Sequence, residues 1–199
     1  MKTKKLRILS ALLALAMMLA LMPTAAFAED STGSNIITYN CGENGDNVVA
    51  TLDTVTGVMT ISGTGAMVDY SEYNQPWYNQ KNNIKKLVVE DEVTCIGRSA
   101  FYKCTELAEV DMSNAINLIT ISENAFGGCS GLKTVALPQD GVLETIGWNA
   151  FSYFYYDSRD RPASIEKIVI PASVKVIGQY AFDGCASLSE VSFAPGSQL

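Results

Sequence analysis

Histidine does not occur anywhere in the 199 residues of this chain. Its absence excludes the commonest general base, the Ser-His and Cys-His nucleophile pairs and most catalytic zinc sites. Carboxylate pairs and Ser-Lys pairs remain as formal routes to catalysis. However, no nucleophile, base and orienting group converge in the sequence pattern. We therefore expect that this chain is not an enzyme.

Cysteine is also scarce, and no C-x-x-C pair occurs among the five cysteines. A structural zinc site or a thioredoxin-like redox motif therefore has no support. The segment GTG at 63–65 is not followed by Gly-Lys-Ser/Thr, so it does not form a phosphate loop. The acidic stretch EDE at 90–92 lacks the spacing of a calcium loop. The sequence accordingly predicts no metal and no cofactor.

Basic residues are fewer than acidic ones, 14 against 21, and four of them lie before an apolar run from Ile8 to Met22. Pro23 ends the run, and Ala26 and Ala28 are small residues at the two positions that a signal peptidase reads, an order typical of a secretory signal. The run is shorter than the about 20 residues of a membrane span. Cleavage near Ala28 would leave 10 basic and 21 acidic residues, a net charge of −11 that disfavours nucleic acid as a partner. We expect a secreted or cell-surface protein without a membrane span after cleavage.

One pattern returns along the chain. Its copies are SAFYKC at 99–104, NAFGGC at 124–129, NAFSYF at 149–154 and YAFDGC at 180–185. Alternating apolar runs begin at Ile84, Leu107, Leu132, Ile165 and Leu188, and the interval between starts is nearly constant except for a longer one from Leu132 to Ile165. A period of about 20–29 residues with such strands predicts a leucine-rich solenoid, because a single coil cannot bury its own apolar side. Stacked coils would place Leu on Leu, Ile on Ile and Phe on Phe.

We therefore expect an α/β solenoid with short parallel strands, right-handed connections and return segments made of short helices or turns. In the return segments Phe should fill the interior, and Cys104, Cys129 and Cys185 should form a buried column of free thiols. Cys41 and Cys95 lie outside the repeat. An exported protein can join them by a disulfide, and the spacing leaves both states open.

These residues strongly resemble the BspA-like (Treponema pallidum-type) leucine-rich repeat family, whose pattern is approximately L-x-x-I-x-I-P-x-x-V-x-x-I-G-x-x-A-F-x-x-C-x-x-L. The segment IEKIVIPASVKVIGQYAFDGCASL at 165–188 matches nearly every position. Departures include Ser122 in place of Gly, Phe154 in place of Cys and an insert of eight residues. The resemblance implies an exported bacterial surface protein that acts by binding or adhesion.

The sequence indicates three parts: a signal peptide at 1–28, a small β unit at 29–83 and leucine-rich repeats at 84–199. In the second part, VVATLD and VMTIS alternate as two strands around a turn that ends at Gly57, which predicts a β-hairpin. This unit would cover the open end of the solenoid. The repeats comprise about four coils and a truncated fifth, so we expect a fragment of a longer protein.

The strand positions that face outward predict a concave binding surface. By the alternation they are Lys86, Val88, Glu109, Asp111, Thr134, Ala136, Lys167, Val169, Glu190 and Ser192. The insert at 152–162 is a second candidate, because it holds residue types favoured at binding hot spots. These are Tyr153, Tyr155, Tyr156, Arg159 and Arg161. The competing interpretations are a solvated strand face without a ligand and a loop whose aromatic side chains pack on the coil.

Other aromatic residues precede the repeats. Tyr70, Tyr73, Trp77 and Tyr78 are interpreted as packing for the N-terminal unit rather than as a sugar-binding platform. Together the patterns favour a leucine-rich repeat protein that mediates protein–protein or host/matrix adhesion, with an extracellular protein or glycan as its partner. Two alternatives stay open: a targeting arm of a larger exported enzyme or surface protein, and a carbohydrate-binding arm that uses the insert.

Overall fold

The structure is a computed structural model, and it describes residues 35–153 and 165–199. Residues Asn35–Leu199 form one compact unit. The predicted signal peptide lies outside the described residues. So do Tyr155, Tyr156, Arg159 and Arg161 of the insert.

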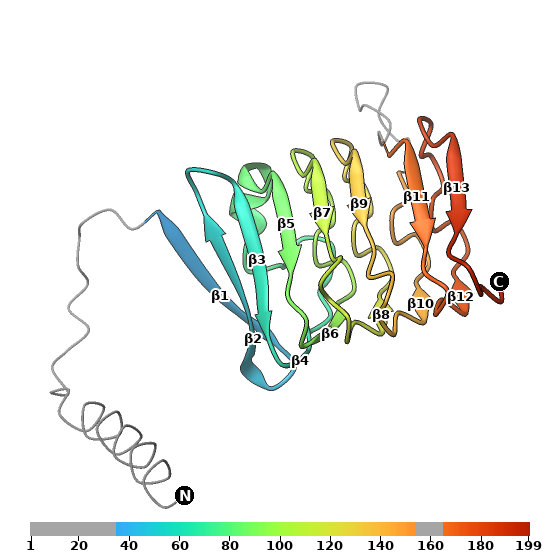
Figure 1. Cartoon of the computed structure of the whole chain (residues 1–199). Coiled ribbons are helices and arrows are strands. Elements are labelled where there is room, and N and C mark those ends of the chain that lie inside the picture. The colour runs from blue at the N-terminus through green and yellow to red at the C-terminus, as the bar shows by residue number, and fades with distance from the viewer. Residues whose placement is uncertain (1–34, 154–164) are drawn as a thin grey trace, which may run out of the picture. The chain divides into compact units, whose positions relative to one another are not determined.

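The first sheet has six strands in the order β1-β2-β3-β5-β7-β9 (Figure 1). Their bounds are β1 Ile36–Gly42, β2 Gly45–Asp53, β3 Val58–Gly63, β5 Lys86–Val89, β7 Glu109–Asp111 and β9 Thr134–Ala136. β1, β2 and β3 pair antiparallel, whereas β3, β5, β7 and β9 pair parallel. The repeats therefore continue the sheet that the N-terminal strands begin.

A second parallel sheet runs along the opposite edge of the coils in the order β12-β10-β8-β6-β4. Its strands are β4 Gly65–Ala66, β6 Val93–Ile96, β8 Thr120–Ile121, β10 Thr145–Ile146 and β12 Val176–Ile177. Two further strands, β11 Lys167–Ile170 and β13 Glu190–Phe193, pair parallel as a separate sheet. Each coil thus contributes one strand to each side, which is the arrangement of a β-solenoid with parallel strands.

The return segments are turns, and the only helix in the described part of the chain is a 3-10 helix, η1 Tyr78–Asn83. Little helix is present because each return segment contains a residue with positive φ, as at Asn124 (φ 54°), which interrupts a right-handed helix. The N–H groups of these segments alternate: those of Ala100, Tyr102 and Cys104 bond within their own turn, whereas the N–H groups between them bond to the next coil. The backbone N–H of each phenylalanine in the column donates to an alanine carbonyl of the next coil at 2.8 Å: Phe101 to Ala125, Phe126 to Ala150 and Phe151 to Ala181.

Five aromatic rings stack through the interior along the return side. Trp77, Phe101, Phe126, Phe151 and Phe182 follow one another with centroid separations of 5.4, 5.4, 5.1 and 5.4 Å. The planes of successive rings differ by 19° at most. This stack confirms that Phe lies on Phe in successive coils, and it extends the column by a residue that the repeat pattern did not include.

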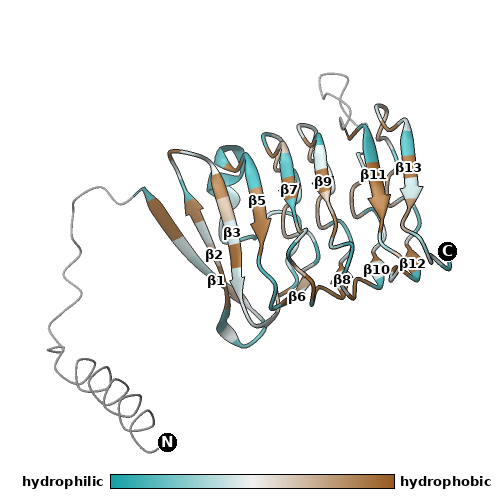
Figure 2. Cartoon of the chain, in the orientation of Figure 1, coloured by the Kyte–Doolittle hydropathy of each residue, from teal (hydrophilic) through white to brown (hydrophobic). Residues whose placement is uncertain are grey.

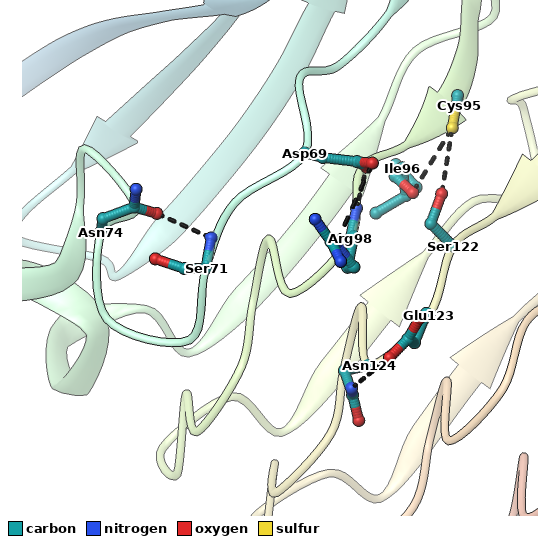
Figure 3. Close-up of polar contacts among 9 residues, drawn as sticks. All are labelled: Asp69, Ser71, Asn74, Cys95, Ile96, Arg98, Ser122, Glu123 and Asn124. Carbon is teal, nitrogen blue, oxygen red and sulfur yellow. Dashed lines mark hydrogen bonds and ion pairs between the residues drawn. The ribbon is translucent and has the colours of Figure 1, made fainter.

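The N-terminal strands join the first coil through the segment that follows β4. Figure 3 shows Asp69 beside Arg98, where an Asp69 carboxylate oxygen accepts the Arg98 backbone N–H at 2.7 Å. The backbone N–H of Tyr70 in turn donates to the Arg98 carbonyl at 2.9 Å. Segment 65–70 is therefore hydrogen-bonded to the first coil in the way that one coil is bonded to the next.

The strand ladder is interrupted between β9 and β11, and we call this place the seam. Between other neighbouring strands of the face, one backbone hydrogen bond recurs just before the strands begin. The N–H of Ala108 donates to the carbonyl of Lys85, that of Lys133 to the carbonyl of Ala108, and that of Ser189 to the carbonyl of Glu166, at 2.8–3.0 Å. The corresponding bond from Glu166 to Lys133 is missing from the described structure. The Gln139 side-chain amide bridges the seam instead, donating to the carbonyls of Leu137 (3.2 Å) and Val169 (3.1 Å). The seam coincides with the longest interval between apolar runs, from Leu132 to Ile165.

We predict that hydrogen exchange will reveal the seam. The Glu166 amide should exchange at least about tenfold faster than the Lys133 and Ser189 amides, because an unpaired surface amide needs no opening event. All three residues are exposed and hold equivalent places in their coils, so they are matched. Exchange measured by NMR provides the test. Equal protection at the three amides would show that the ladder is continuous in solution.

Candidate functional site

The predicted surface positions form two rows across the strands, which we call the strand face. The pairing aligns Lys86, Glu109 and Thr134 in the first row and Val88, Asp111 and Ala136 in the second. On the separate pair of strands, Lys167 aligns with Glu190 and Val169 with Ser192. All ten side chains are partly or fully exposed. The structure therefore brings the ten predicted residues together on one face of two adjacent sheets.

The alternation that produces this face also fills the interior. Leu87, Val110 and Ile168 lie between the two rows and are buried. Successive side chains of a strand point to opposite sides, so the buried positions fix the outward ones. Figure 2 shows the result as hydrophilic ends at the start of β5, β7, β11 and β13 next to hydrophobic residues.

The charges of the first row neutralise one another. Lys86 contacts Glu109 and Lys167 contacts Glu190, each with Nζ 2.7 Å from a carboxylate oxygen. The hydrogen bond that each lysine donates to its glutamate raises the pKa of that lysine. In the second row, the hydroxyl and backbone N–H of Ser113 bond to Asp111 and lower the pKa of its carboxyl. These pairs are solvent-exposed, so they order the surface more than they stabilise the fold.

Small and apolar side chains make up most of the second row. The side chain of Val169, within β11, is 46% exposed although it is apolar. Together with Val88 and Ala136 it forms an apolar stripe beside the row of charge pairs, and the Asp111 carboxylate interrupts this stripe between Val88 and Ala136. An apolar centre with a polar border is the usual composition of a protein-binding surface.

The insert contributes less to the described surface than its composition suggested. Tyr153 is only 5% exposed, so its ring belongs to the interior of the solenoid. The other predicted residues of the insert fall outside the described part of the chain. The two candidate sites therefore stand apart: the structure places all residues of the strand face, and of the insert it places Tyr153.

The cysteines are free thiols in the described residues, and the repeat column is buried as predicted. The Cys129 thiol donates to the Phe101 carbonyl at 3.1 Å and the Cys185 thiol to the Phe151 carbonyl at 3.3 Å. Burial raises the pKa of Cys129 to about 12 and that of Cys185 to about 11. Both are therefore protonated at neutral pH, and they serve as small buried donors instead of nucleophiles.

The two cysteines outside the repeat are separated by a strand. Ala66 pairs with Cys95, whereas Val68 donates its N–H to the Cys41 carbonyl at 2.9 Å. Figure 3 shows the Cys95 sulfur 3.3 Å from the Ser122 hydroxyl. Burial raises the pKa of Cys41 to about 12 and also raises that of Cys95. Neither thiol has the lowered pKa of a reactive cysteine.

In the described ranges, no group of three or more His, Cys, Asp or Glu side chains is placed to hold a metal ion. In the same residues no helix is long and apolar enough to cross a membrane. The described surface presents charge pairs, small apolar side chains and exposed aromatic rings.

Comparison with known sequences decides the family. The model of the BspA type leucine rich repeat region matches residues 73–159 and 159–198, with six copies. The chain belongs to the BspA type leucine-rich repeat family. The resemblance noted in the sequence is thereby confirmed, and the match begins at residue 73, before the first predicted repeat strand.

Solved structures share this fold. A leucine-rich repeat protein from Eubacterium ventriosum ATCC 27560 is 27% identical with a TM-score of 0.53, over 82% of this chain and 45% of that one. A Treponema pallidum leucine-rich repeat protein is 24% identical with a TM-score of 0.52, over 71% and 66%. A Bacteroides ovatus ATCC 8483 protein is 20% identical with a TM-score of 0.52, over 82% and 41%. The chain therefore spans less than half the length of two of these proteins. Among curated proteins none is similar enough to match.

Sequence reasoning missed two features of the surface. The seam was missed because the role of Gln139 depends on which backbone groups the ladder leaves unpaired. Tyr70 and Trp77 are buried as predicted, but Tyr73 is exposed and contacts Tyr78 and Tyr102. The available signal was that Tyr102, unlike its equivalents in later copies of the pattern, is aromatic.

Proposed function

We propose that this chain is an exported bacterial protein that binds an extracellular protein, on a host, a matrix or a neighbouring cell, through the strand face. One observation carries the proposal. Ten outward side chains from five strands lie in two rows, in register within each of the two sheets, with Lys–Glu ion pairs in the first row and mostly small or apolar side chains in the second. Leucine-rich repeat proteins generally bind proteins, and such sheets offer a broad surface on a rigid scaffold.

The proposal includes the organisation of the chain. Residues 1–28 would act as a signal peptide with cleavage near Ala28, and 29–83 would cover the N-terminal end of the repeats at 84–199. Right-handed winding is part of the same proposal, because parallel strands joined by crossovers are nearly always right-handed. The alternative within the same proposal is a role as the targeting or carbohydrate-binding arm of a larger surface protein or enzyme.

We predict that Val169→Arg will weaken binding to a partner found in a panel of extracellular-matrix proteins by at least about tenfold, which equals about 1.4 kcal/mol. The long charged side chain would stand in the apolar stripe and leave a desolvated charge in the interface. Binding is measured by surface plasmon resonance with the purified protein and the immobilised panel. Circular dichroism checks that the variant is folded.

Val176→Arg is the matched control. Val176 is 51% exposed, close to the 46% of Val169, but it lies on β12 of the opposite sheet. This variant should bind normally if the strand face makes the contact. Equal losses for both variants, or a loss for Val176→Arg alone, would contradict the proposed surface. Absence of binding to every matrix protein would contradict the adhesive role.

A further inference from the structure

A cluster of aromatic and basic side chains lies where η1 meets the first return segment, and we call it the tyrosine–lysine patch. It comprises Tyr73, Tyr78, Lys81, Tyr102 and Lys103. The Tyr73 ring makes edge-to-face contacts with Tyr78 and Tyr102, with centroids 6.0 and 6.3 Å apart. Lys81 Nζ lies 4.1 Å from the Tyr78 centroid, and Lys103 Nζ lies 5.4 Å from the Tyr102 centroid.

The scaffold does not require these side chains. At the place of Tyr102 and Lys103, the later copies of the pattern have Gly-Gly, Ser-Tyr and Asp-Gly. Gly127 makes room for Tyr102, whereas Gly128 also has a positive φ of 74°, which favours glycine in itself. A Cβ on Gly127 would lie 3.2 Å from a Tyr102 ring carbon, and one on Gly128 would lie 2.9 Å from the Lys103 side chain. Residues that depart from the repeat, with neighbours shaped to accommodate them, indicate a role beyond packing.

Exposure separates this patch from the buried aromatic residues nearby. Tyr73 is 56% exposed, although Tyr70 and Trp77, close to it in sequence, are buried. An exposed tyrosine held by two aromatic neighbours loses little conformational freedom when a ligand covers it. It presents a broad apolar ring with a polar hydroxyl, the combination that suits the apolar faces and hydroxyl groups of a sugar ring.

Cation–π contact distinguishes the two lysines of the patch from the other basic residues of the described ranges. Lys86, Arg98, Lys167 and Lys175 each lie beside a carboxylate. Lys81 and Lys103, like Lys85 and Lys133, form no ion pair within the described ranges, but of these four only Lys81 and Lys103 lie over tyrosine rings. The ammonium groups of Lys81 and Lys103 give the patch a local positive charge because no carboxylate is paired with them. This charge contrasts with the net charge of −7 of the whole sequence. Such a site attracts an anion from solution.

We propose that the tyrosine–lysine patch binds an acidic sugar residue, a uronic or sialic acid, of an extracellular glycan. The Tyr73 ring would stack on the apolar face of the sugar, and the ammonium groups of Lys81 and Lys103 would contact its carboxylate. The site belongs to the return side and not to the strand face, so it is independent of the proposed protein-binding surface.

Isothermal titration calorimetry with the purified protein tests this site. The probes are 3′-sialyllactose and trigalacturonate, with lactose and the methyl-esterified trigalacturonate as neutral counterparts. We expect at least one acidic probe to bind, its neutral counterpart to bind at least about tenfold more weakly, and its affinity to fall as salt screens the charge. Tyr73→Ala should reduce affinity by about tenfold or more, and Lys81→Met with Lys103→Met should do the same while keeping the apolar stems.

Tyr180→Ala is the matched control, because Tyr180 is 51% exposed and lies on a later return segment. It should bind the acidic probe normally, as should Val169→Arg on the strand face. Melting curves of the variants show whether each remains folded. The proposal is overturned if no acidic probe binds, if neutral probes bind equally, or if Tyr73→Ala binds normally. None of these results bears on the strand face, which Val169→Arg tests separately.

Discussion

Replacing Phe126 by alanine should lower the free energy of unfolding by about 3–5 kcal/mol. The Phe126 ring lies between Phe101 and Phe151, with centroids 5.4 and 5.1 Å away, and it is almost completely buried. Alanine would remove contacts with both neighbouring coils and leave a cavity that the stacked turns cannot close. Because each coil contacts only its neighbours, loss at a central coil weakens two interfaces at once. Urea unfolding followed by circular dichroism measures the effect.

Phe193→Ala is the control for this prediction. Phe193 pairs with Ile170 in the ladder and occupies an inward strand position, yet it is 50% exposed because β13 has no neighbour on its outer side in the described structure. Its replacement should cost about 1 kcal/mol or less, as is usual for exposed sites. Equal losses for Phe126→Ala and Phe193→Ala would show that burial in the stack is not what determines the cost. Phe126→Leu, which keeps most of the volume, should fall between the two.

The interior of the repeats was predictable because its constraints are local and recur. The spacing of Ile and A-F in each copy placed Phe101, Phe126 and Phe151 in one column, and the strand alternation placed Val169 and its partners outside. Each copy repeats the same demand for apolar volume at the same distance along the chain. The outward positions follow from the inward ones, so the residues of the strand face were predictable as well.

Departures from the repeat were not predictable, since they depend on contacts between coils. The sequence left short helices or turns open for the return segments, and turns result because alternate N–H groups of these segments bond to the next coil. The role of Gln139 arises only because the ladder between β9 and β11 is open. Tyr73 is exposed because its ring rests on Tyr102 from another segment. Pairings of this kind have no period in the sequence.

Trp77 stands between these two cases. It precedes Phe101 by nearly the same interval as Phe101 precedes Phe126, so the period itself placed it in the column. The missing signal was the residue type, because Trp follows Pro here and no A-F pair marks the place. Its ring stacks on Phe101 with planes 19° apart, and Tyr39 and Tyr70 contact it edge-to-face. It therefore connects the N-terminal strands to the first coil.

Trp77→Ala should lower the free energy of unfolding by about 3–5 kcal/mol and loosen the N-terminal strands from the repeats. The indole is fully buried, and its Nε1–H donates to the Ala100 carbonyl at 2.9 Å. Trp77→Phe keeps a ring on the stack but leaves that carbonyl without its donor, so it should cost about 1–3 kcal/mol. Urea unfolding by circular dichroism compares the two variants with the unmodified protein.

Intrinsic fluorescence then locates the effect. The chain has two tryptophans, and Trp148 is exposed, so a Trp148→Phe protein reports on Trp77 alone. Its emission should be that of a buried indole and should shift to the red in the same transition that circular dichroism records. An earlier fluorescence transition would mean that the N-terminal strands separate before the coils unfold. In that case Trp77 would cover one end of the solenoid without coupling it to the rest, and Trp77→Ala would not lower the free energy of unfolding of the central coils.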